Sequence, residues 1–295
     1  MDNKNKRTSI PDRVKAFLRQ EVGFGCPVKG CGNPYLEYHH FDPPVKVRAH
    51  NEPNGMIALC AQHHKKADGD LYTVEQLHAL KADKINAELV RGNLDWLRKD
   101  LLAVVGGNLF YEVPRILVVD DVEVVALYRD ADGYLRLNIN MLSLEAEDRL
   151  IVDRNEWKNV GDPLDLRSPP QGKELEVKYR NGDYLHLRFF VIEDFKTLFK
   201  RYPLIGSDDN GIITYPVTIV EVNFRAAGAD VEVTPDGTKF NKCAINGVFV
   251  AYCGGGICIS TRNKWRQNPQ PVDPRFLYAP NTYLTHVRFT RGKDE

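Results

Sequence analysis

The pattern of apolar and polar positions changes near residue 105, from helical spacing to the alternation that is typical of β-strands. In residues 9–23, apolar side chains recur on one helical face, and Pro11 stands where a first helical turn accepts proline. In residues 73–90, the same spacing follows a Thr-x-x-Gln capping signal that begins at Thr73. The sequence therefore predicts two helices in the first third of the chain.

After the paired glycines at Gly106 and Gly107, apolar and polar residues alternate, as they do in strands with one buried face. Two-residue Asp-Gly and Asn-Gly turns predict hairpins over residues 124–142 and 173–192. The pattern also predicts a short helix and two further stretches of strand, over residues 193–202, 215–237 and 246–260.

Length and composition are consistent with two globular domains of ordinary size. The chain has 295 residues, of which 43% are hydrophobic and 27% are charged, so it can bury a substantial core. We therefore expect an α+β protein with a small domain in residues 1–103 and a mainly antiparallel β domain in residues 113–295. The boundary is expected at about residues 100–112.

The overall charge is balanced, with 40 basic and 40 acidic residues, which argues against a nucleic-acid coat protein or a polybasic membrane protein. Residues 1–103 nevertheless carry 16 basic and 13 acidic side chains. No stretch approaches the roughly 18 apolar residues of a membrane helix, and the first residues lack the apolar core of a signal peptide. We therefore expect a cytoplasmic protein without a membrane partner, in which clustered cysteines and histidines bind metal rather than form disulfides.

Cysteine and histidine are concentrated between Cys26 and His64, where three of the six cysteines and five of the eight histidines lie. Cys26 and Cys31 are separated by a short segment with proline and glycine, and Cys60 and His63 form a second pair about thirty residues later. Two such pairs make a Cys3His set, which is typical of a closed, tetrahedral structural zinc site.

Three other histidines are placed for a second kind of site. His39 and His40 stand in a segment with strand character, so their side chains should point to opposite faces. One imidazole can then hold a cation while its neighbour activates a water molecule. His64 follows a zinc ligand at the start of an expected helix, so it projects about 100° away from His63 and can face a second, open metal site.

Over about residues 10–82, these residues and their spacing resemble the HNH endonuclease family in its zinc-bearing form. The resemblance implies a ββα-metal nuclease module, in which a hairpin and a helix hold one divalent cation, and it implies cleavage of phosphodiester bonds. It assigns His40 as the general base, and His39 and His64 as ligands of the catalytic cation. The zinc set matches the two knuckles of the family: Cys26, Cys31, Cys60 and His63.

The sequence departs from the family at the middle asparagine. That residue commonly lies five positions before the knuckle cysteine, where this chain has Gly55, with Asn54 one residue earlier. The resemblance implies that Asn54 braces the loop that positions the base; the alternative is that the segment is only a turn. His50 lies in the same loop and is left outside the expected site, because a loop histidine is more often solvated than catalytic.

The chemistry of phosphodiester hydrolysis suits these residue types. An imidazole with a pKa near 6.5 can take a proton from water at neutral pH, and a cation can neutralise charge on the phosphate oxygens. The sequence does not identify the cation, because imidazoles favour Mn²⁺ and later metals whereas cellular Mg²⁺ is abundant. We expect contacts to DNA phosphates from Lys46, Arg48, Lys65 and Lys66, and from the basic start of the chain at Lys4, Lys6 and Arg7.

The expected function is that of a metal-dependent DNA endonuclease, with restriction, anti-phage defence or a mobile element as the setting that the resemblance implies. A zinc protein that binds nucleic acid without cutting it, and a toxin or RNA nuclease, are the alternatives. The sequence allows four roles for the β domain: target choice, ligand sensing, oligomerisation and binding of a partner protein. A segment with basic and aromatic residues at 263–271 is weak evidence for a nucleic-acid surface.

Overall fold

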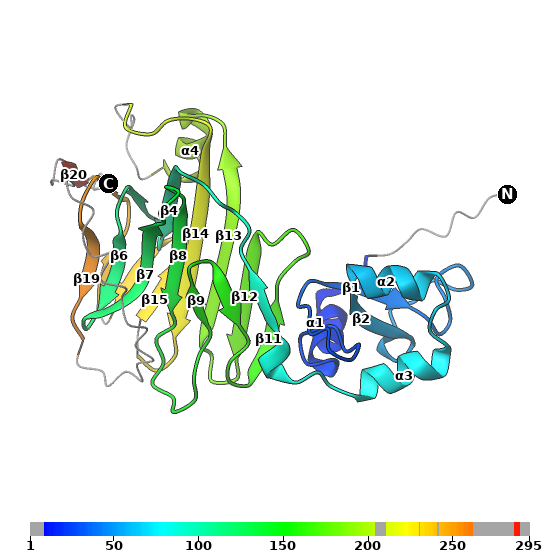
Figure 1. Ribbon diagram of the computed structural model, residues 1–295. Helices are drawn as coiled ribbons and strands as arrows, with labels where there is room; N and C mark the ends of the chain where they lie inside the picture. Colours follow the sequence, from blue (N-terminus) through cyan, green and yellow to red (C-terminus); the bar gives the residue numbers. More distant parts are fainter. Residues whose placement is uncertain (1–8, 204–210, 230, 241, 262–285, 290–295) are drawn as a thin grey trace.

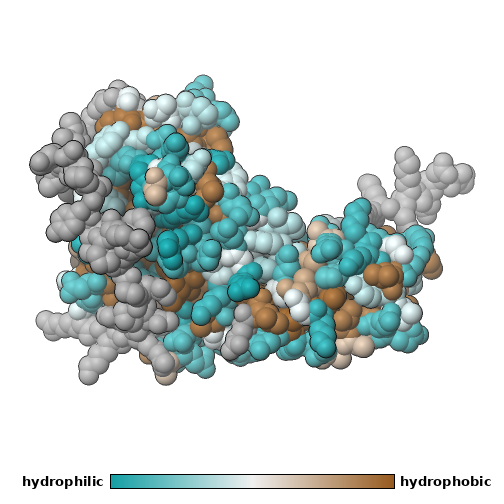
Figure 2. Space-filling model, viewed as in Figure 1, coloured by the Kyte–Doolittle hydropathy of each residue, from teal (hydrophilic) through white to brown (hydrophobic). Residues whose placement is uncertain are grey.

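The computed structural model (Figure 1) describes residues 9–203, 211–229, 231–240, 242–261 and 286–289. The basic start of the chain and the segment 263–271 lie outside these residues. The described part forms two lobes of unequal height joined at a waist (Figures 1 and 2). Among the described residues, no helix is both long enough and apolar enough to cross a membrane.

The smaller lobe, which we call the N-terminal module, comprises residues 9–83 and is built around one hairpin. Strands β1 (Leu36–His40) and β2 (Met56–Cys60) pair antiparallel, with His40 opposite Met56 and Leu36 opposite Cys60. The other elements of the module are α1 (Asp12–Glu21), a 3-10 turn η1 (Pro53–Gly55), α2 (Ala61–Asp68) and α3 (Val74–Ala82). Strand β2 is buried along its whole length, between α1 and α2.

The last helix of the module is shorter than the sequence pattern predicts. Its predicted start is confirmed, because Thr73 and Gln76 form both hydrogen bonds of a capping box. The helix ends at Ala82, whereas the pattern predicted a helix to residue 90. The reason is a tertiary contact: Ile85 donates its backbone N–H to Val22 and packs against the core of the larger lobe.

The larger lobe, which we call the β sandwich, consists of two sheets with a shared apolar core. The first sheet has the order β19-β6-β7-β8-β9-β10-β3. Its strands are β3 (Arg91–Asn93), β6 (Arg115–Val119), β7 (Val122–Arg129), β8 (Leu135–Asn140), β9 (Ile151–Asp153), β10 (Glu156–Lys158) and β19 (Gly255–Ile259).

The second sheet follows the path β11-β12-β13-β14-β4-β5-β18-β20, and β15, β16 and β17 extend from β14. Its strands are β4 (Leu101–Val105), β5 (Asn108–Tyr111), β11 (Pro163–Arg167), β12 (Glu174–Tyr179), β13 (Tyr184–Ile192), β14 (Val217–Ala226), β15 (Val231–Thr234), β16 (Gly237–Phe240), β17 (Cys243–Ile245), β18 (Val248–Ala251) and β20 (His286–Phe289). A short helix, α4 (Phe195–Arg201), covers the outer face of this sheet.

The structure confirms a mixed α and β protein with mainly antiparallel sheets. Both predicted hairpins are present, as β7 paired with β8 and β12 paired with β13. Only three of the strand pairs among the described residues are parallel, namely β4 with β14, β5 with β18 and β6 with β19.

Strands of the sandwich begin before the boundary that was expected at residues 100–112. Strand β3 pairs with β10, and β4 pairs with β14 and β5, so residues 91–93 and 101–105 belong to the two sheets. Val90 and Leu94 are fully buried in the same apolar core. The connection between the lobes therefore lies near residues 83–90.

The two lobes contact each other through α1 and β11. Arg19 of α1 forms a two-pronged ion pair with Asp165 of β11, at 2.9 Å from Nε and 2.6 Å from Nη2, and donates from Nη1 to the Tyr38 hydroxyl at 2.6 Å. The side chains of Arg19 and Asp165 are 6% and 14% exposed. This contact joins the β sandwich to β1, the strand that carries His39 and His40.

Replacing Asp165 by alanine is expected to lower the free energy of unfolding by about 3–5 kcal/mol, because it leaves the Arg19 guanidinium buried without its carboxylate. Asp162 is the matched control, because its ion pair with Arg180 spans 3.8 Å and is exposed, so Asp162→Ala should change stability by less than about 1 kcal/mol. Denaturant unfolding measures both variants. Equal stability of the two variants would show that the Arg19–Asp165 contact does not stabilise the protein.

Candidate functional site

Four side chains of the N-terminal module converge in a compact cluster, which we call the thiol cluster. Cys26, Cys31, Cys60 and His63 each place one ligand atom within 4.8 Å of all the others. The Cys31 and Cys60 sulfur atoms are 3.8 Å apart, and Nδ1 of His63 lies 3.3 Å from the Cys26 sulfur and 3.2 Å from the Cys60 sulfur. Sulfur ligands at 2.3 Å from a tetrahedral zinc ion are about 3.8 Å apart. The thiol cluster can therefore hold a metal ion such as zinc.

Local backbone structure brings the two pairs of ligands together. The turn between Cys26 and Cys31 is closed by hydrogen bonds from Cys31 N–H to Val28 and from Gly32 N–H to Cys26. Gly32 has a φ of +60°, and a Cβ there would lie 2.5 Å from the Leu89 carbonyl oxygen, so this turn requires glycine. Cys60 ends β2 and is the N-cap of α2, which places His63 within the first helical turn.

Burial acts on the protonation of the thiol cluster. It raises the pKa of the Cys26 thiol well above its ordinary value, and it also raises the pKa of Cys31. Burial lowers the pKa of His63, which favours the neutral imidazole that metals bind. The three cysteines are free thiols. A bound cation would reverse the effect of burial on the thiols, because thiolates are the ligand form.

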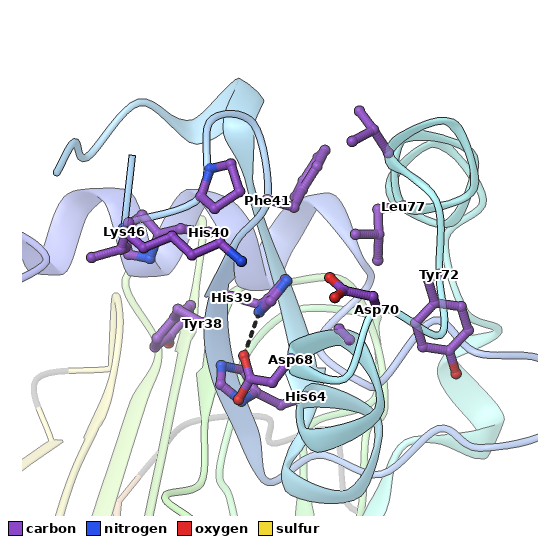
Figure 3. Close-up of a pocket in the computed structure, with 14 residues that line it drawn as sticks. Tyr38, His39, His40, Phe41, Lys46, His64, Asp68, Asp70, Tyr72 and Leu77 are labelled. Carbon is purple, nitrogen blue, oxygen red and sulfur yellow. Dashed lines mark ion pairs between the residues drawn. The ribbon is translucent and has the colours of Figure 1, made fainter. Parts of the chain in front are cut away.

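A second group of possible ligands lies between β1 and α2, and we call it the histidine cluster. It consists of His39, His64 and Asp68, whose ligand atoms all lie within 4.8 Å of one another. Nδ1 of His39 is 3.2 Å from one carboxylate oxygen of Asp68, and Nδ1 of His64 is 3.4 Å from the other. Figure 3 shows the three side chains directed toward one another. The predicted strand and helix positions of His39 and His64 are confirmed.

The two histidines of this cluster differ in their surroundings. The His39 residue is 9% exposed, and burial, followed by the nearby charge of His64, lowers its pKa below the ordinary value of imidazole. The neutral, ligating form of His39 is therefore favoured at neutral pH. Nδ1 of His64 is also 3.5 Å from a carboxylate oxygen of Glu37, on the same face of β1 as His39.

His40 is held by the loop that follows β1. Its Nε2 lies 3.0 Å from the carbonyl oxygen of His50. Because a carbonyl oxygen only accepts hydrogen bonds, Nε2 of neutral His40 carries the hydrogen, and Nδ1 is the basic nitrogen. The orientation and tautomer of His40 therefore suit a proton acceptor.

His50 braces this loop, a role that the family pattern had assigned to Asn54. The Glu52 N–H donates to Nδ1 of His50, and Nε2 of His50 donates to the Pro43 carbonyl at 2.9 Å. Asn54 lies in the turn η1 with its side chain exposed. The carbonyl of the neighbouring Gly55 accepts from Phe41 and Asp42, so the backbone makes the connection across the loop at this point.

Gly55 is required at this position by close packing, because a Cβ there would lie 1.8 Å from the Asp42 carbonyl oxygen. An asparagine at the family position would collide with the loop in this conformation. The close packing at Gly55 therefore accounts for the glycine that this sequence has at the family's asparagine position.

The histidine cluster and His40 line one open pocket of about 320 Å³ (Figure 3). Lys46 also lines this pocket, whereas Arg48 forms an exposed ion pair with Glu52 at 3.2 Å. Lys65 and Lys66 are exposed on α2, next to His64. Of the predicted phosphate contacts that lie in the described residues, Lys46 is thus the one that borders the pocket.

Two site residues were missed from the sequence. Asp68 lies four residues after His64 in α2, and residues at this spacing share a helical face, so the spacing was a usable signal. His50 had no comparable signal, because its role depends on the path of an irregular loop. In comparisons with family models, curated proteins and solved structures, no match to this chain was found.

Proposed function

We propose that this protein is a metal-dependent endonuclease that hydrolyses phosphodiester bonds of DNA in the pocket of the histidine cluster. The observation that carries the proposal is that His40 lines one open pocket together with His39, His64 and Asp68. The His50 carbonyl fixes the His40 ring by accepting from Nε2, which makes Nδ1 the basic nitrogen. The likeness of the N-terminal module to the zinc-bearing HNH family rests on the sequence resemblance and on the order of β1, β2 and α2 along the chain.

For the thiol cluster we propose a structural zinc site. Three thiols and one imidazole make a closed tetrahedral set, with no position left for a substrate. The cluster joins the turn before β1 to the junction of β2 and α2. A zinc ion there would stabilise the module that carries the catalytic residues.

For the histidine cluster we propose a catalytic site for Mg²⁺ or Mn²⁺. Two imidazoles and one carboxylate are ligands that these cations accept, and an open pocket leaves room for water and phosphate. When bound, the cation supplies positive charge to the phosphate oxygens and to the leaving 3′ oxygen. His39, His64 and Asp68 hold it in place.

His40 would supply the base in this reaction. Its Nδ1 accepts a proton from water, and the hydrogen bond from Nε2 to the His50 carbonyl stabilises the imidazolium that forms. Lys46, at the edge of the pocket, would bind a phosphate oxygen by charge.

The role of Asp68 in metal binding is tested by Asp68→Asn. The variant should need about tenfold or more metal for half-maximal cleavage, because it replaces a charged ligand by a neutral one, and saturating metal should restore most of the rate. A metal titration of plasmid cleavage measures this. The control is Asp83→Asn, an exposed residue at the end of α3, which should keep the wild-type metal requirement. An unchanged requirement in Asp68→Asn would remove Asp68 from the site.

Two other functions predict different outcomes with the same substrates. A protein that only binds nucleic acid would bind a plasmid without cutting it, whichever divalent cation is added. A nuclease for RNA would cut an RNA strand faster than DNA of the same sequence. A panel of supercoiled plasmid, single-stranded DNA and RNA, each with the same cation, distinguishes the three functions.

A further inference from the structure

A second cleft, of about 600 Å³, lies between the N-terminal module and the β sandwich. We call it the interlobe cleft. One wall is α1, and the other is formed by β11, β12 and residues 168–170. The Arg19–Asp165 ion pair and the Tyr38 side chain, which are buried or half-buried, also line it. Because α1 and β11 contact each other through this pair, the cleft is part of the junction of the lobes.

The side chains of the interlobe cleft are mainly basic. Five cationic residues line it, against three acidic residues. The basic residues are Arg13, Lys15, Arg19, Arg167 and Lys178, and the acidic residues are Asp12, Asp165 and Glu176. The cleft therefore carries a net positive charge and attracts anions.

Three of these five cations have ion-pair partners that a phosphate can replace. Arg167 pairs with Glu174 and Glu176, and its side chain is 39% exposed. Lys15 pairs with Asp12 at 3.0 Å and Lys178 with Glu176 at 2.9 Å, but both lysine side chains are partly exposed. Such pairs contribute at most about 1 kcal/mol. Arg13 is exposed and forms no ion pair among the described residues. Arg19 is different, because its buried pair with Asp165 keeps it in a structural role.

The interlobe cleft and the proposed catalytic pocket share one lining residue on β1. Tyr38 lines both, and on β1 it lies two residues before His40. Residues two apart on a strand share a face and are about 7 Å apart. A nucleic-acid strand with its scissile phosphate beside His40 can thus extend along this face toward the basic side chains of the cleft.

We infer that the interlobe cleft binds phosphates of the DNA strand that flanks the scissile phosphate. This inference rests on the proposed function. It gives the β sandwich a direct part in substrate binding, through Lys178 and Arg167, rather than only in the choice of target. It also explains why a buried ion pair fixes the two lobes beside the cleft, because both walls must contact one strand.

The test uses the double variant Arg13→Ala/Lys178→Ala, which removes one exposed cation from each wall. The matched control is Lys84→Ala/Lys239→Ala, which removes one exposed lysine from the connection between the lobes and one from the β sandwich, neither of which lines a pocket. Both sets carry His40→Ala in the binding experiment, so that duplex DNA stays intact. Affinity for one duplex is measured over a range of salt concentrations.

The double variant is expected to bind about tenfold more weakly at moderate salt, and its slope of log affinity against log salt should be shallower by about 2. The control should match the parent. With His40 present, the control should cleave DNA as wild type does, and the double variant should need a higher DNA concentration for half-maximal cleavage. Thermal unfolding checks that the variants fold alike.

Equal affinity and salt slope in the double variant and the control would overturn the inference, and cleavage by wild type in the same experiment would leave the proposed function intact. A wild-type protein that neither binds nor cuts DNA would overturn both. A loss of binding that appears with an RNA duplex and not with DNA would overturn DNA as the occupant of the cleft.

Discussion

Replacing His40 by alanine is expected to slow DNA cleavage by about 10²- to 10⁴-fold, the range for removal of a positioned proton acceptor. Metal content, folding and DNA affinity should stay close to wild type, because His40 belongs to neither cluster of metal ligands. Single-turnover cleavage of plasmid at neutral pH and saturating metal measures the rate.

Two comparisons make the His40 result specific. His39→Ala and His64→Ala should regain part of their activity as the metal concentration rises, because added cation can refill a weakened site but cannot replace a base. His78→Ala is the matched control, since this exposed histidine of α3 contacts Phe41 but does not line the pocket. A His40→Ala protein that cuts at the wild-type rate would refute the assignment of His40 as the base.

Replacing Cys60 by serine is expected to abolish tight zinc binding and to unfold much of the N-terminal module. Wild-type protein should carry about one zinc per chain, and structural zinc sites contribute on the order of 10 kcal/mol to small domains. Cys60 also joins β2 to α2, so its loss affects the strand and the helix that carry the proposed site. Elemental analysis and hydrogen exchange of residues 20–82 measure the two effects.

Cys258→Ser is the matched control for this substitution. Cys258 is an exposed free thiol of β19 in the sandwich, far along the chain from the thiol cluster, so the variant should keep its zinc and its exchange pattern. Active wild-type protein without zinc, or a Cys60→Ser protein with wild-type zinc content, would contradict the proposed role of the thiol cluster.

Spacing in the sequence predicted which ligands gather, because short-range geometry determines their positions. The alternation of a strand separates His39 from His40, and the rotation of 100° per helical residue separates His63 from His64. The structure brings His63 into the thiol cluster and His64 into the histidine cluster, as these periods require.

Other features depended on contacts between distant segments, and the sequence pattern did not predict them. Periodicity continued the α3 helix to residue 90, but the packing of Ile85 against the β sandwich ends it at Ala82. The apolar run of β4 could not be assigned to the β sandwich without its pairing to β14, more than a hundred residues later. The bracing of His40 by His50 likewise depends on the path of the loop, which short-range rules do not predict.

The same limit applied to the junction of the lobes. Arg19 and Asp165 are 146 residues apart in the chain, and each alone has the appearance of an ordinary surface charge. Only the fold shows that they meet, that they are buried, and that they lie beside the interlobe cleft. The proposed part of the β sandwich in DNA binding therefore rests on the fold and not on the sequence pattern.

The central claim is that this protein cuts DNA in the pocket of the histidine cluster. Its most direct test is incubation of the zinc-loaded wild-type protein with supercoiled plasmid, in a series of divalent cations and in a sample without added cation. The proposal predicts nicked or linear plasmid that accumulates with Mg²⁺ or Mn²⁺ and stays absent without added cation. Plasmid that remains supercoiled with every cation, while the protein is folded and binds DNA, would contradict it.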